Sequence, residues 1–183
     1  MTQVRLDQFD NANYHPGSTL KRALWYVMGL FWVESAIPWP SSLKRSVLKL
    51  FGASIGKNVI IKPRVRIKYP WKLNVGDHTW IGEDVWIDNL DKVTIGSHCC
   101  ISQGAYLLCG NHDYTKPTFD LITGQITMMD GSWAGAKSIL GPGAVLETEA
   151  VLAAGSMGLG RLEQGKIHQG NPAQPVRERK ITT

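Results

Sequence analysis

The stretch LNVGDHTWIGEDVWIDNLDKVTIGSHCCISQGAYL, residues 73–107, carries the repeat that decides the fold. Aliphatic residues recur at six-residue spacing in it, and a small or apolar residue stands two positions before each one. The recurring residues are Val75, Ile81, Ile87, Ile95, Ile101 and Leu107. Because side chains alternate across a strand, each pair of inward positions indicates a short β segment. A strand and a corner in every six residues make a coil rather than a helix or a sheet meander.

The same pattern extends in both directions along the chain. Equivalent residues stand before and after this stretch: Ile55, Ile61, Ile67, Met128, Ala134, Leu140, Leu146 and Leu152. Glycine directly follows the recurring residue at six positions, where we expect it to supply a left-handed backbone conformation at the corner. These glycines are Gly56, Gly76, Gly82, Gly96, Gly135 and Gly141. The pattern predicts an all-β fold, a parallel β-helix of about five coils within residues 52–168.

The spacing between coils places every insertion at one corner. The leading residues of the first three coils, Ile55, Val75 and Ile95, are 20 positions apart, two more than three hexads need. The next leading residue follows Leu107 after 21 positions instead of six, which inserts a long loop, 109–125. Insertions in repeat proteins gather on the binding face, so this corner is the expected functional site.

Composition narrows the class of protein. The chain of 183 residues is 43% hydrophobic and 19% charged, as is typical of a globular protein rather than a disordered or fibrous one. A net charge of +5 permits an anionic ligand, and we expect no nucleic-acid partner. Three cysteines, two of them adjacent, argue against a disulfide framework and favour a reducing, cytoplasmic location. The sequence contains no phosphate-binding loop, dinucleotide fingerprint or zinc-type Cys/His spacing.

A leader, 1–51, precedes the repeat, and a tail, 169–183, follows it. The leader contains an apolar run at 23–33, which Glu34 ends. This run is too short to span a membrane, because a spanning helix needs about 20 apolar residues. It is consistent with a helix packed on the protein or a partner subunit, which we favour. The alternative is a helix within 20–39 that lies on the inner membrane surface, with Trp25, Trp32 and Trp39 as anchors.

The repeat and several longer motifs resemble a known family. The motifs are LFGASIGKNVIIKP (50–63), YPWKL (69–73), ISQGAYLLCGNHDY (101–114), DGSWAGAKSILGPGAVL (130–146) and QGNPAQPVRER (169–179). They resemble the hexapeptide-repeat acyltransferases, which fold as left-handed parallel β-helices. The chain is most similar to the maltose/galactoside O-acetyltransferase branch and, within it, to the colanic-acid-biosynthesis acetyltransferases. The resemblance implies a homotrimer with active sites between subunits. It also implies direct acetyl transfer from acetyl-CoA to a sugar hydroxyl in exopolysaccharide biosynthesis, with no metal.

The candidate general base is His112, in the long loop at the functional corner. Removing a hydroxyl proton at neutral pH needs a base, and histidine is the usual one. The resembling enzymes carry their catalytic histidine at this position, although a solvated loop histidine would look the same from the sequence. His78 and His98 occupy equivalent outward positions of successive coils, and we expect them to stack about 5 Å apart.

A base histidine usually has a partner that orients its other ring nitrogen. Coil stacking places Asp88 and Asn89 one coil below His112 at the same corner, and relatives carry an acceptor-binding Asn near here. We therefore include both among the catalytic residues, although Asn and Asp are also common in plain turns. Asp113 is a rival orienting residue that could instead cap the loop.

The resemblance implies that acetyl-CoA lies in a groove between two β-helices. Small residues would let the donor approach the backbone, and the Ala136 N–H would stabilise the oxyanion of the intermediate. Corners need small residues in any case, and Trp133 could fill a subunit interface instead of flanking CoA. The chain lacks the family's Thr-Lys-Asp run after the last coil, and Arg161 could replace the CoA contact that this run makes. The tail arginines, Arg177 and Arg179, would bind the CoA phosphates. The implied donor-binding residues are Trp133, Gly135, Ala136, Ala153, Ala154, Arg161, Arg177 and Arg179.

Two other functions fit parts of the sequence. One is an inactive scaffold or binding module whose CoA groove has degenerated. The other is a zinc hydratase, because some β-helix proteins of this kind bind zinc through three histidines. The set His78, His98 and His112 fits poorly, because the third lies on another face.

Overall fold

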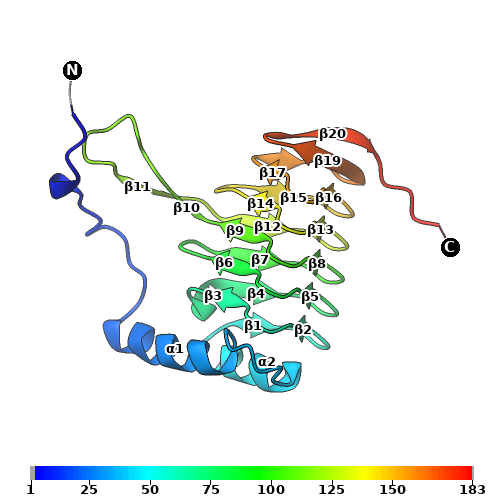
Figure 1. Ribbon diagram of the computed structural model, residues 1–183, viewed down its shortest axis with the longest axis horizontal. Coiled ribbons are helices and arrows are strands. Elements are labelled where there is room, and N and C mark those ends of the chain that lie inside the picture. Colours follow the sequence, from blue (N-terminus) through cyan, green and yellow to red (C-terminus); the bar gives the residue numbers. More distant parts are fainter. Residues whose placement is uncertain (1–2, 183) are drawn as a thin grey trace.

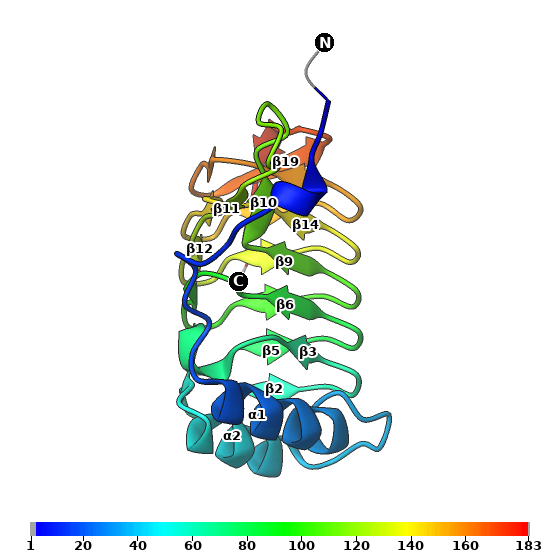
Figure 2. The ribbon, with the colours of Figure 1, turned by 90° about the vertical axis from the view of Figure 1, so that its left-hand side faces the viewer.

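Short parallel strands stack into three sheets that form the faces of a prism (Figures 1 and 2). The computed structural model describes residues 3–182. The first face contains β1 (Ser54–Ile55), β4 (Leu73–Val75), β7 (Val93–Ile95), β12 (Ile126–Met128), β15 (Val145–Leu146) and β18 (Arg161–Leu162). The second contains β2 (Ile60–Ile61), β5 (Trp80–Ile81), β8 (Cys100–Ile101), β13 (Trp133–Ala134), β16 (Val151–Leu152), β19 (Lys166–Gly170) and β20 (Ala173–Glu178). The third contains β3 (Arg66–Ile67), β6 (Trp86–Asp88), β9 (Tyr106–Leu108), β14 (Ile139–Leu140) and β17 (Met157–Gly158).

The chain passes through the three faces in turn, so five coils are complete and a sixth begins with β18 and β19. The first coils pair in a 20-residue register, with Ile55 opposite Val75 and Val75 opposite Ile95. Every recurring residue from Ile55 to Leu152 is at most 5% exposed, and the residue two positions before it is buried as well. Each buried aliphatic side chain contributes about 1.5–3 kcal/mol, so the repeat itself forms the core. The expected all-β fold, a β-helix of hexapeptide repeats, is confirmed.

The role we predicted for the corner glycines is wrong. None of the six has a positive φ; the left-handed residue stands three positions before the recurring aliphatic, as at His78 and His98. The glycines are needed because successive coils touch there. A Cβ at Gly76 would lie 2.6 Å from the Gly96 carbonyl carbon, and one at Gly135 would lie 2.6 Å from the Ala154 nitrogen.

This difference gives a stability prediction. A Cβ at Gly96 would collide with the Asp130 carboxylate and lie 2.8 Å from the Asp130 nitrogen. We expect Gly96→Ala to lower the free energy of unfolding by about 1–3 kcal/mol, the usual effect of overpacking. Gly143 has a φ of +79° and no atom near its missing Cβ. Gly143→Asn should therefore cost much less, because Asn tolerates the left-handed region. Equal losses for both variants in denaturant unfolding would contradict this account.

All three insertions connect the third face to the first, as predicted. They are 68–72, 89–92 and 109–125, and the first contains a turn of 3-10 helix, η2 (Pro70–Lys72). The longest contains an antiparallel hairpin of β10 (Gly110–His112) and β11 (Leu121–Thr123). This hairpin projects from the prism, and the N-terminal segment with η1 (Leu6–Gln8) runs beside it (Figures 1 and 2).

Two helices close the end of the prism below the first coil (Figure 1). Helix α1 (Thr19–Trp32) begins at Ser18, whose hydroxyl accepts a hydrogen bond from the Lys21 N–H, and α2 (Ser41–Leu50) follows Pro40. Their side chains donate hydrogen bonds to backbone carbonyl groups of the first coil, whose lower edge has no neighbouring strand. Trp25 Nε1 donates to the Ile67 carbonyl at 2.8 Å, and the fully buried Lys44 donates to the Lys62 carbonyl at 2.8 Å. The helices thus cover strand edges that would otherwise be unpaired.

The other end is closed by the segment that we treated as a tail. Strand β20 lies antiparallel on β19 and extends the second face by one strand. In β19, His168 is 2% exposed, and its Nε2 accepts a hydrogen bond from the Glu163 N–H at 3.2 Å. Burial lowers the pKa of His168 below its ordinary value of 6.5.

This histidine predicts acid-sensitive stability. Below pH 6.5 the unfolded chain binds a proton that the folded His168 does not, so stability should fall from there toward the lowered pKa. Protonation would also remove the acceptor of the Glu163 N–H. We expect His168→Gln to reduce the difference in melting temperature between pH 7.5 and pH 5, since Gln stays neutral. An unchanged difference would assign the acid sensitivity to other groups.

Within residues 3–182, no helix has the length and apolar character needed to cross a bilayer.

Candidate active site

His112 is held on the projecting hairpin by its neighbour across the loop. Its Nδ1 lies 2.8 Å from the Phe119 carbonyl oxygen, and its ring stacks on Phe119 at 4.8 Å between centroids. Phe9 of the N-terminal segment contacts the ring edge-on at 5.7 Å. Phe119 has a φ of +53°, a left-handed conformation that is uncommon for a bulky residue. The hairpin therefore maintains an unfavourable backbone geometry where it presents this carbonyl to the imidazole.

The hydrogen bond to Phe119 fixes the tautomer of His112. A carbonyl oxygen can only accept, so Nδ1 must carry the proton. Nε2 is then the unprotonated nitrogen, and it has no hydrogen-bond partner among the described residues. A neutral imidazole with a free Nε2 is the form that a general base requires.

A polar pocket of about 270 Å³ lies beside this histidine, between the N-terminal segment and β11. His112 pairs with Leu121 across the hairpin, and cross-strand partners share a face, as does Thr123 two residues further along β11. Leu121 and Thr123 both line the pocket, which places it next to the strand that pairs with His112. The lining is rich in carboxylates, amides and hydroxyls: Asp10, Asn11, Asn13, Tyr14, Asp120, Leu121 and Thr123.

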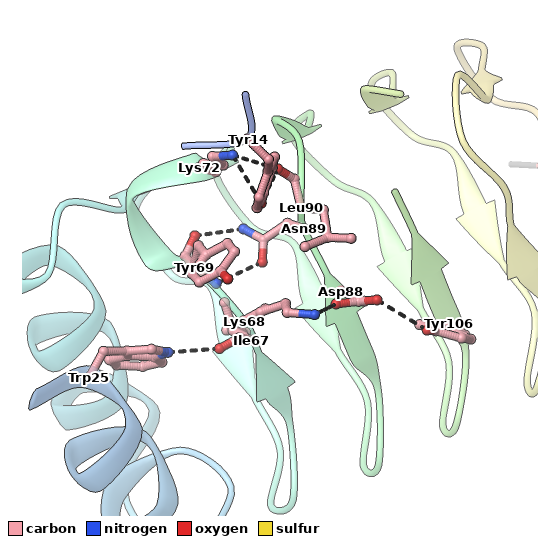
Figure 3. A network of polar contacts seen from close by, with 10 residues as sticks. All are labelled: Tyr14, Trp25, Ile67, Lys68, Tyr69, Lys72, Asp88, Asn89, Leu90 and Tyr106. Atoms are coloured by element: carbon pink, nitrogen blue, oxygen red, sulfur yellow. Dashed lines mark hydrogen bonds and ion pairs between the residues drawn. The ribbon is translucent and has the colours of Figure 1, made fainter. Parts of the chain in front are cut away.

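The two predicted partners of His112 both lie one coil lower, and their side chains bond to other residues there (Figure 3). Asn89 is fully buried, and its amide exchanges hydrogen bonds with the backbone of Tyr69, accepting at 2.9 Å and donating at 2.6 Å. Asp88 forms an ion pair with Lys68 at 2.9 Å and accepts a hydrogen bond from the Tyr106 hydroxyl at 3.3 Å. Neither residue hydrogen-bonds His112 within residues 3–182. The orienting group within the chain is instead the Phe119 carbonyl.

Asp113, the rival orienting residue, caps the loop. Its carboxylate accepts hydrogen bonds from the N–H and hydroxyl of Thr115, and these bonds lower its pKa. It forms no hydrogen bond with His112 in the described part of the chain.

Asp88 lines a cavity of about 520 Å³ between α1 and the third face. Arg66 stacks on Trp86 at 4.5 Å, and Trp86 stacks on Tyr106 at 4.5 Å. Burial beside Asp88 raises the pKa of Tyr106 to about 12, so its hydroxyl remains a donor. The cavity thus combines aromatic faces with fixed charges.

The 89–92 insertion, below the β10–β11 hairpin, is anchored by the N-terminal segment and by the 68–72 insertion (Figure 3). The Tyr14 hydroxyl donates to the Leu90 carbonyl at 2.7 Å, and the Lys72 ammonium donates to the same oxygen. Burial raises the pKa of Tyr14 and lowers that of Lys72. These contacts hold residues 9–14 beside the polar pocket.

The small residues predicted to bind the donor gather at another corner, between the second and third faces. Ala136 follows β13, and Ala153 and Ala154 follow β16 at the same corner one coil higher. The Ala136 N–H donates to no backbone carbonyl in the described residues, so it remains free for a ligand. Gly135 has a structural explanation, since coil stacking leaves no space for a Cβ. A groove of about 370 Å³ continues along this edge in the lower coils and includes Trp80, Gly82, Glu83, Ser102 and Gln103.

The three arginines predicted to contact CoA differ in whether their side chains are free to bind it. Arg179 donates to the Gly131 carbonyl at 2.7 Å and the Glu149 carbonyl at 3.1 Å, and it also pairs with the Glu149 carboxylate. Arg161 pairs with Glu147 on the first face. The Arg177 side chain is exposed and has no ion-pair or hydrogen-bond partner among the described residues. Of the three side chains it is therefore the most available to a ligand.

Trp133 is exposed on the second face, and its indole N–H donates a hydrogen bond to the Ser102 hydroxyl at 2.9 Å.

The outward residues of the three faces differ in chemistry. On the second face they are largely apolar: Ile60, Trp80, Cys100, Trp133, Val151 and Ile167. On the first face they are mostly polar: Ser54, Asn74, Thr94, Thr127, Val145 and Arg161. On the third face, Arg66, Trp86 and Tyr106 form a stacked ladder below Ile139 and Met157. Trp80 and Trp133 thus share the apolar second face, whereas Trp86 lies on the third.

The remaining histidines do not form a metal site with His112. His78 and His98 stack as predicted, 5.1 Å apart and nearly parallel, at the corner between the first and second faces. Across residues 3–182, no group of three or more His, Cys, Asp or Glu side chains is arranged to hold a metal ion.

Comparisons with known proteins add family evidence to this geometry. No protein-family model matches the chain. It is 37% identical to the colanic acid biosynthesis acetyltransferase WcaF of Escherichia coli K12 over 171 residues, 91% of each protein. The hexapeptide-repeat acetyltransferase VCA0836 of Vibrio cholerae, solved with acetyl-CoA, superposes with a TM-score of 0.78 at 20% identity and covers 88% of each chain. A galactoside acetyltransferase solved with CoA has a TM-score of 0.78 at 20% identity, covering 88% of this chain and 82% of the other. At that identity, the structural likenesses establish the fold.

Two residues that contact the His112 ring, Phe119 and Phe9, could not be predicted from the sequence. Phe119 acts through its carbonyl, and no residue type marks a backbone carbonyl in a sequence. Phe9 lies in a segment without repeats, so nothing connected it to a loop more than 100 residues later. The one indication in the sequence was the run Asp10-Asn11-Ala12-Asn13, because its polar side chains are suited to bind a polar ligand.

Proposed function

Because the chain belongs to the hexapeptide-repeat acetyltransferase family, in the group of the colanic acid biosynthesis acetyltransferases, we propose that it acetylates a sugar hydroxyl in exopolysaccharide biosynthesis. Acetyl-CoA is the proposed donor. The observation that carries the proposal is the geometry of His112, whose Nδ1 is bonded to Phe119 while Nε2 is free. Nε2 is therefore available to take a proton from an acceptor.

In the proposed direct transfer, His112 Nε2 removes the hydroxyl proton as the oxygen attacks the thioester carbonyl carbon. A C–O bond forms, and the carbonyl oxygen becomes the oxyanion of a tetrahedral intermediate. The free Ala136 N–H is suited to stabilise that oxyanion. The intermediate then collapses, the C–S bond breaks, and the imidazolium returns its proton to the CoA thiolate. The products are the acetyl ester and free CoA, with no other reactant.

The polar pocket beside His112 supports a sugar as the acceptor. Sugars are recognised by side chains that accept and donate hydrogen bonds, and Asp10, Asn13 and Asp120 provide such groups. The aromatic and charged cavity that Asp88 lines, on the third face, offers a second acceptor surface. Asp88 and Asn89 are proposed to act there, on the acceptor, rather than on the His112 ring.

The positions of base and donor support active sites between subunits. His112 lies beyond the corner between the third and first faces, whereas Ala136 lies at the corner between the second and third faces. One chain therefore holds its base and its donor groove on different edges of the prism. The apolar second face borders the donor groove, and an exposed apolar face of this kind favours a subunit contact. A homotrimer would bring the hairpin of one subunit to the groove of the next.

The proposal is tested by acetyl-CoA turnover across a panel of sugar acceptors. Free CoA is measured with a thiol reagent, and the acetylated position is read by NMR. We expect CoA release that depends on a sugar acceptor and an ester as the product. Tight CoA binding with no turnover on any acceptor would instead favour the inactive scaffold.

A further inference from the structure

The outward half of α1 is apolar throughout. Every exposed residue between 20 and 31 is apolar, and six of them are large: Leu20, Leu24, Tyr26, Val27, Leu30 and Phe31. At about 100° per residue they cover roughly half of the helix circumference. A helix at the surface of a globular protein normally presents polar and charged residues there. An uninterrupted apolar face of this width indicates that something covers it.

The apolar face is turned away from the coils. Trp25 and Gly29 form the buried side of the helix, and the indole of Trp25 bonds to the first coil through the Ile67 carbonyl. Most of the large exposed residues lie on the opposite side, and Tyr26, at the edge of the apolar face, lines the cavity between α1 and the third face. Because α1 lies across the end of the prism, this side faces outward at the end of the molecule (Figures 1 and 2). No described part of the chain covers Leu20, which is 70% exposed, or Val27, which is 65% exposed.

The charges around the helix indicate what covers it. Between residues 19 and 51 the chain has five basic residues, Lys21, Arg22, Lys44, Arg45 and Lys49, against one acidic residue, Glu34. Lys49 is exposed at the end of α2. This part of the molecule therefore carries an excess of positive charge, which attracts an anionic surface.

Aromatic rings extend the apolar face past the end of α1. Phe31, Trp32 and Trp39 form a cluster with centroid separations of 4.8–6.0 Å, and Trp39 donates to the Phe31 carbonyl. Tryptophan and tyrosine are enriched at the boundary between membrane and water, because their rings are apolar with a polar edge.

We propose that α1 docks on an anionic lipid bilayer, with its outward face in the boundary between headgroups and acyl chains. The basic residues at headgroup level would be the exposed Lys49 and the partly exposed Lys21, Arg22 and Arg45, since Lys44 is buried. The inference stands apart from the acetyl transfer proposed above, because Leu24 and Val27, the residues replaced in its test, line none of the pockets proposed for acceptor or donor. In the proposed trimer, three such helices would act together and strengthen the attachment.

The test is vesicle flotation of the full chain. Vesicles of phosphatidylcholine with phosphatidylglycerol are compared with vesicles of phosphatidylcholine alone. We expect the protein to float with the anionic vesicles and much less with the neutral ones. The variant Leu24→Glu/Val27→Glu should bind about tenfold more weakly or worse, because it places charge on the inserted face. The matched control, Leu159→Glu/Val176→Glu, has the same change in charge at exposed apolar positions outside the helix layer and should bind nearly normally.

Three results would overturn the inference. The first is failure of the unmodified protein to float with anionic vesicles. The second is equal binding by the α1 variant and the control. The third is a change of oligomeric state in the α1 variant by light scattering with no change in vesicle binding, which would make the face a protein interface. Circular dichroism checks folding, and acetyl-CoA turnover on a soluble acceptor separates this inference from the proposed function, since it should be unchanged in both variants.

Discussion

Replacing His112 with Ala is expected to lower acetyl-CoA turnover on the true acceptor by about 10²–10⁴-fold, the usual contribution of a general base. The proposed donor contacts do not include this side chain, so CoA affinity should change little. The fold should persist, because the hairpin lies outside the core of inward aliphatic residues. Turnover of the unmodified protein should also fall at acid pH, because only neutral imidazole accepts a proton.

The control is His98→Ala, which removes a histidine that is exposed at a corner away from the hairpin. It should retain nearly normal turnover. If His112→Ala retained normal turnover while the fold and CoA affinity were intact, another group would be the base. In that case the Phe119 interaction would be a structural feature of the hairpin only.

Replacing Trp80 with Glu is expected to dissociate the proposed trimer and, with it, to reduce turnover by at least about 100-fold. Trp80 is 57% exposed on the apolar second face, in β5 between β2 and β8. A buried charge there would lack a partner, and each subunit of the trimer would carry it. Light scattering should show monomers, while circular dichroism should remain that of the β-helix, because Trp80 points away from the core.

The matched control is Thr94→Glu, an outward residue of β7 on the polar first face. It introduces the same charge and should leave both the oligomer and the turnover intact. A Trp80→Glu variant that stays trimeric and active would remove the second face from the subunit contact. A monomeric but fully active variant would show that one chain contains a complete site.

The repeat made most of the fold predictable. Six-residue spacing of aliphatics such as Val75, Ile81 and Ile87 reports the inward positions directly, and the 20-residue offset reports the register of the coils. The stacking of His78 on His98 followed from the same offset. The location of the insertions at one corner followed from counting, because each extra residue after a third strand must lie there.

Other features depend on contacts between coils, which the spacing of one coil does not report. Gly96 looked like a left-handed corner residue, but its constraint comes from Asp130 in the next coil. Asn89 looked like a partner of His112, yet its amide binds the Tyr69 backbone one coil below. Phe119 orients the imidazole through a backbone carbonyl, so its side chain gave no indication of that role. The apolar run of the leader predicted a packed helix, yet within α1 only Trp25 and Gly29 are buried.

In the proposed active site, the base and the donor groove belong to different subunits, and mixing two inactive variants tests this most directly. One variant is His112→Ala, and the other is Ala154→Trp, which fills the proposed groove with an exposed side chain and keeps His112. Mixed at equal amounts and allowed to exchange subunits, they should recover about one quarter of normal turnover, because about one quarter of the interfaces combine an intact histidine with an intact groove. Turnover that stays at the level of the separate variants, in trimers shown to be mixed, would contradict the account.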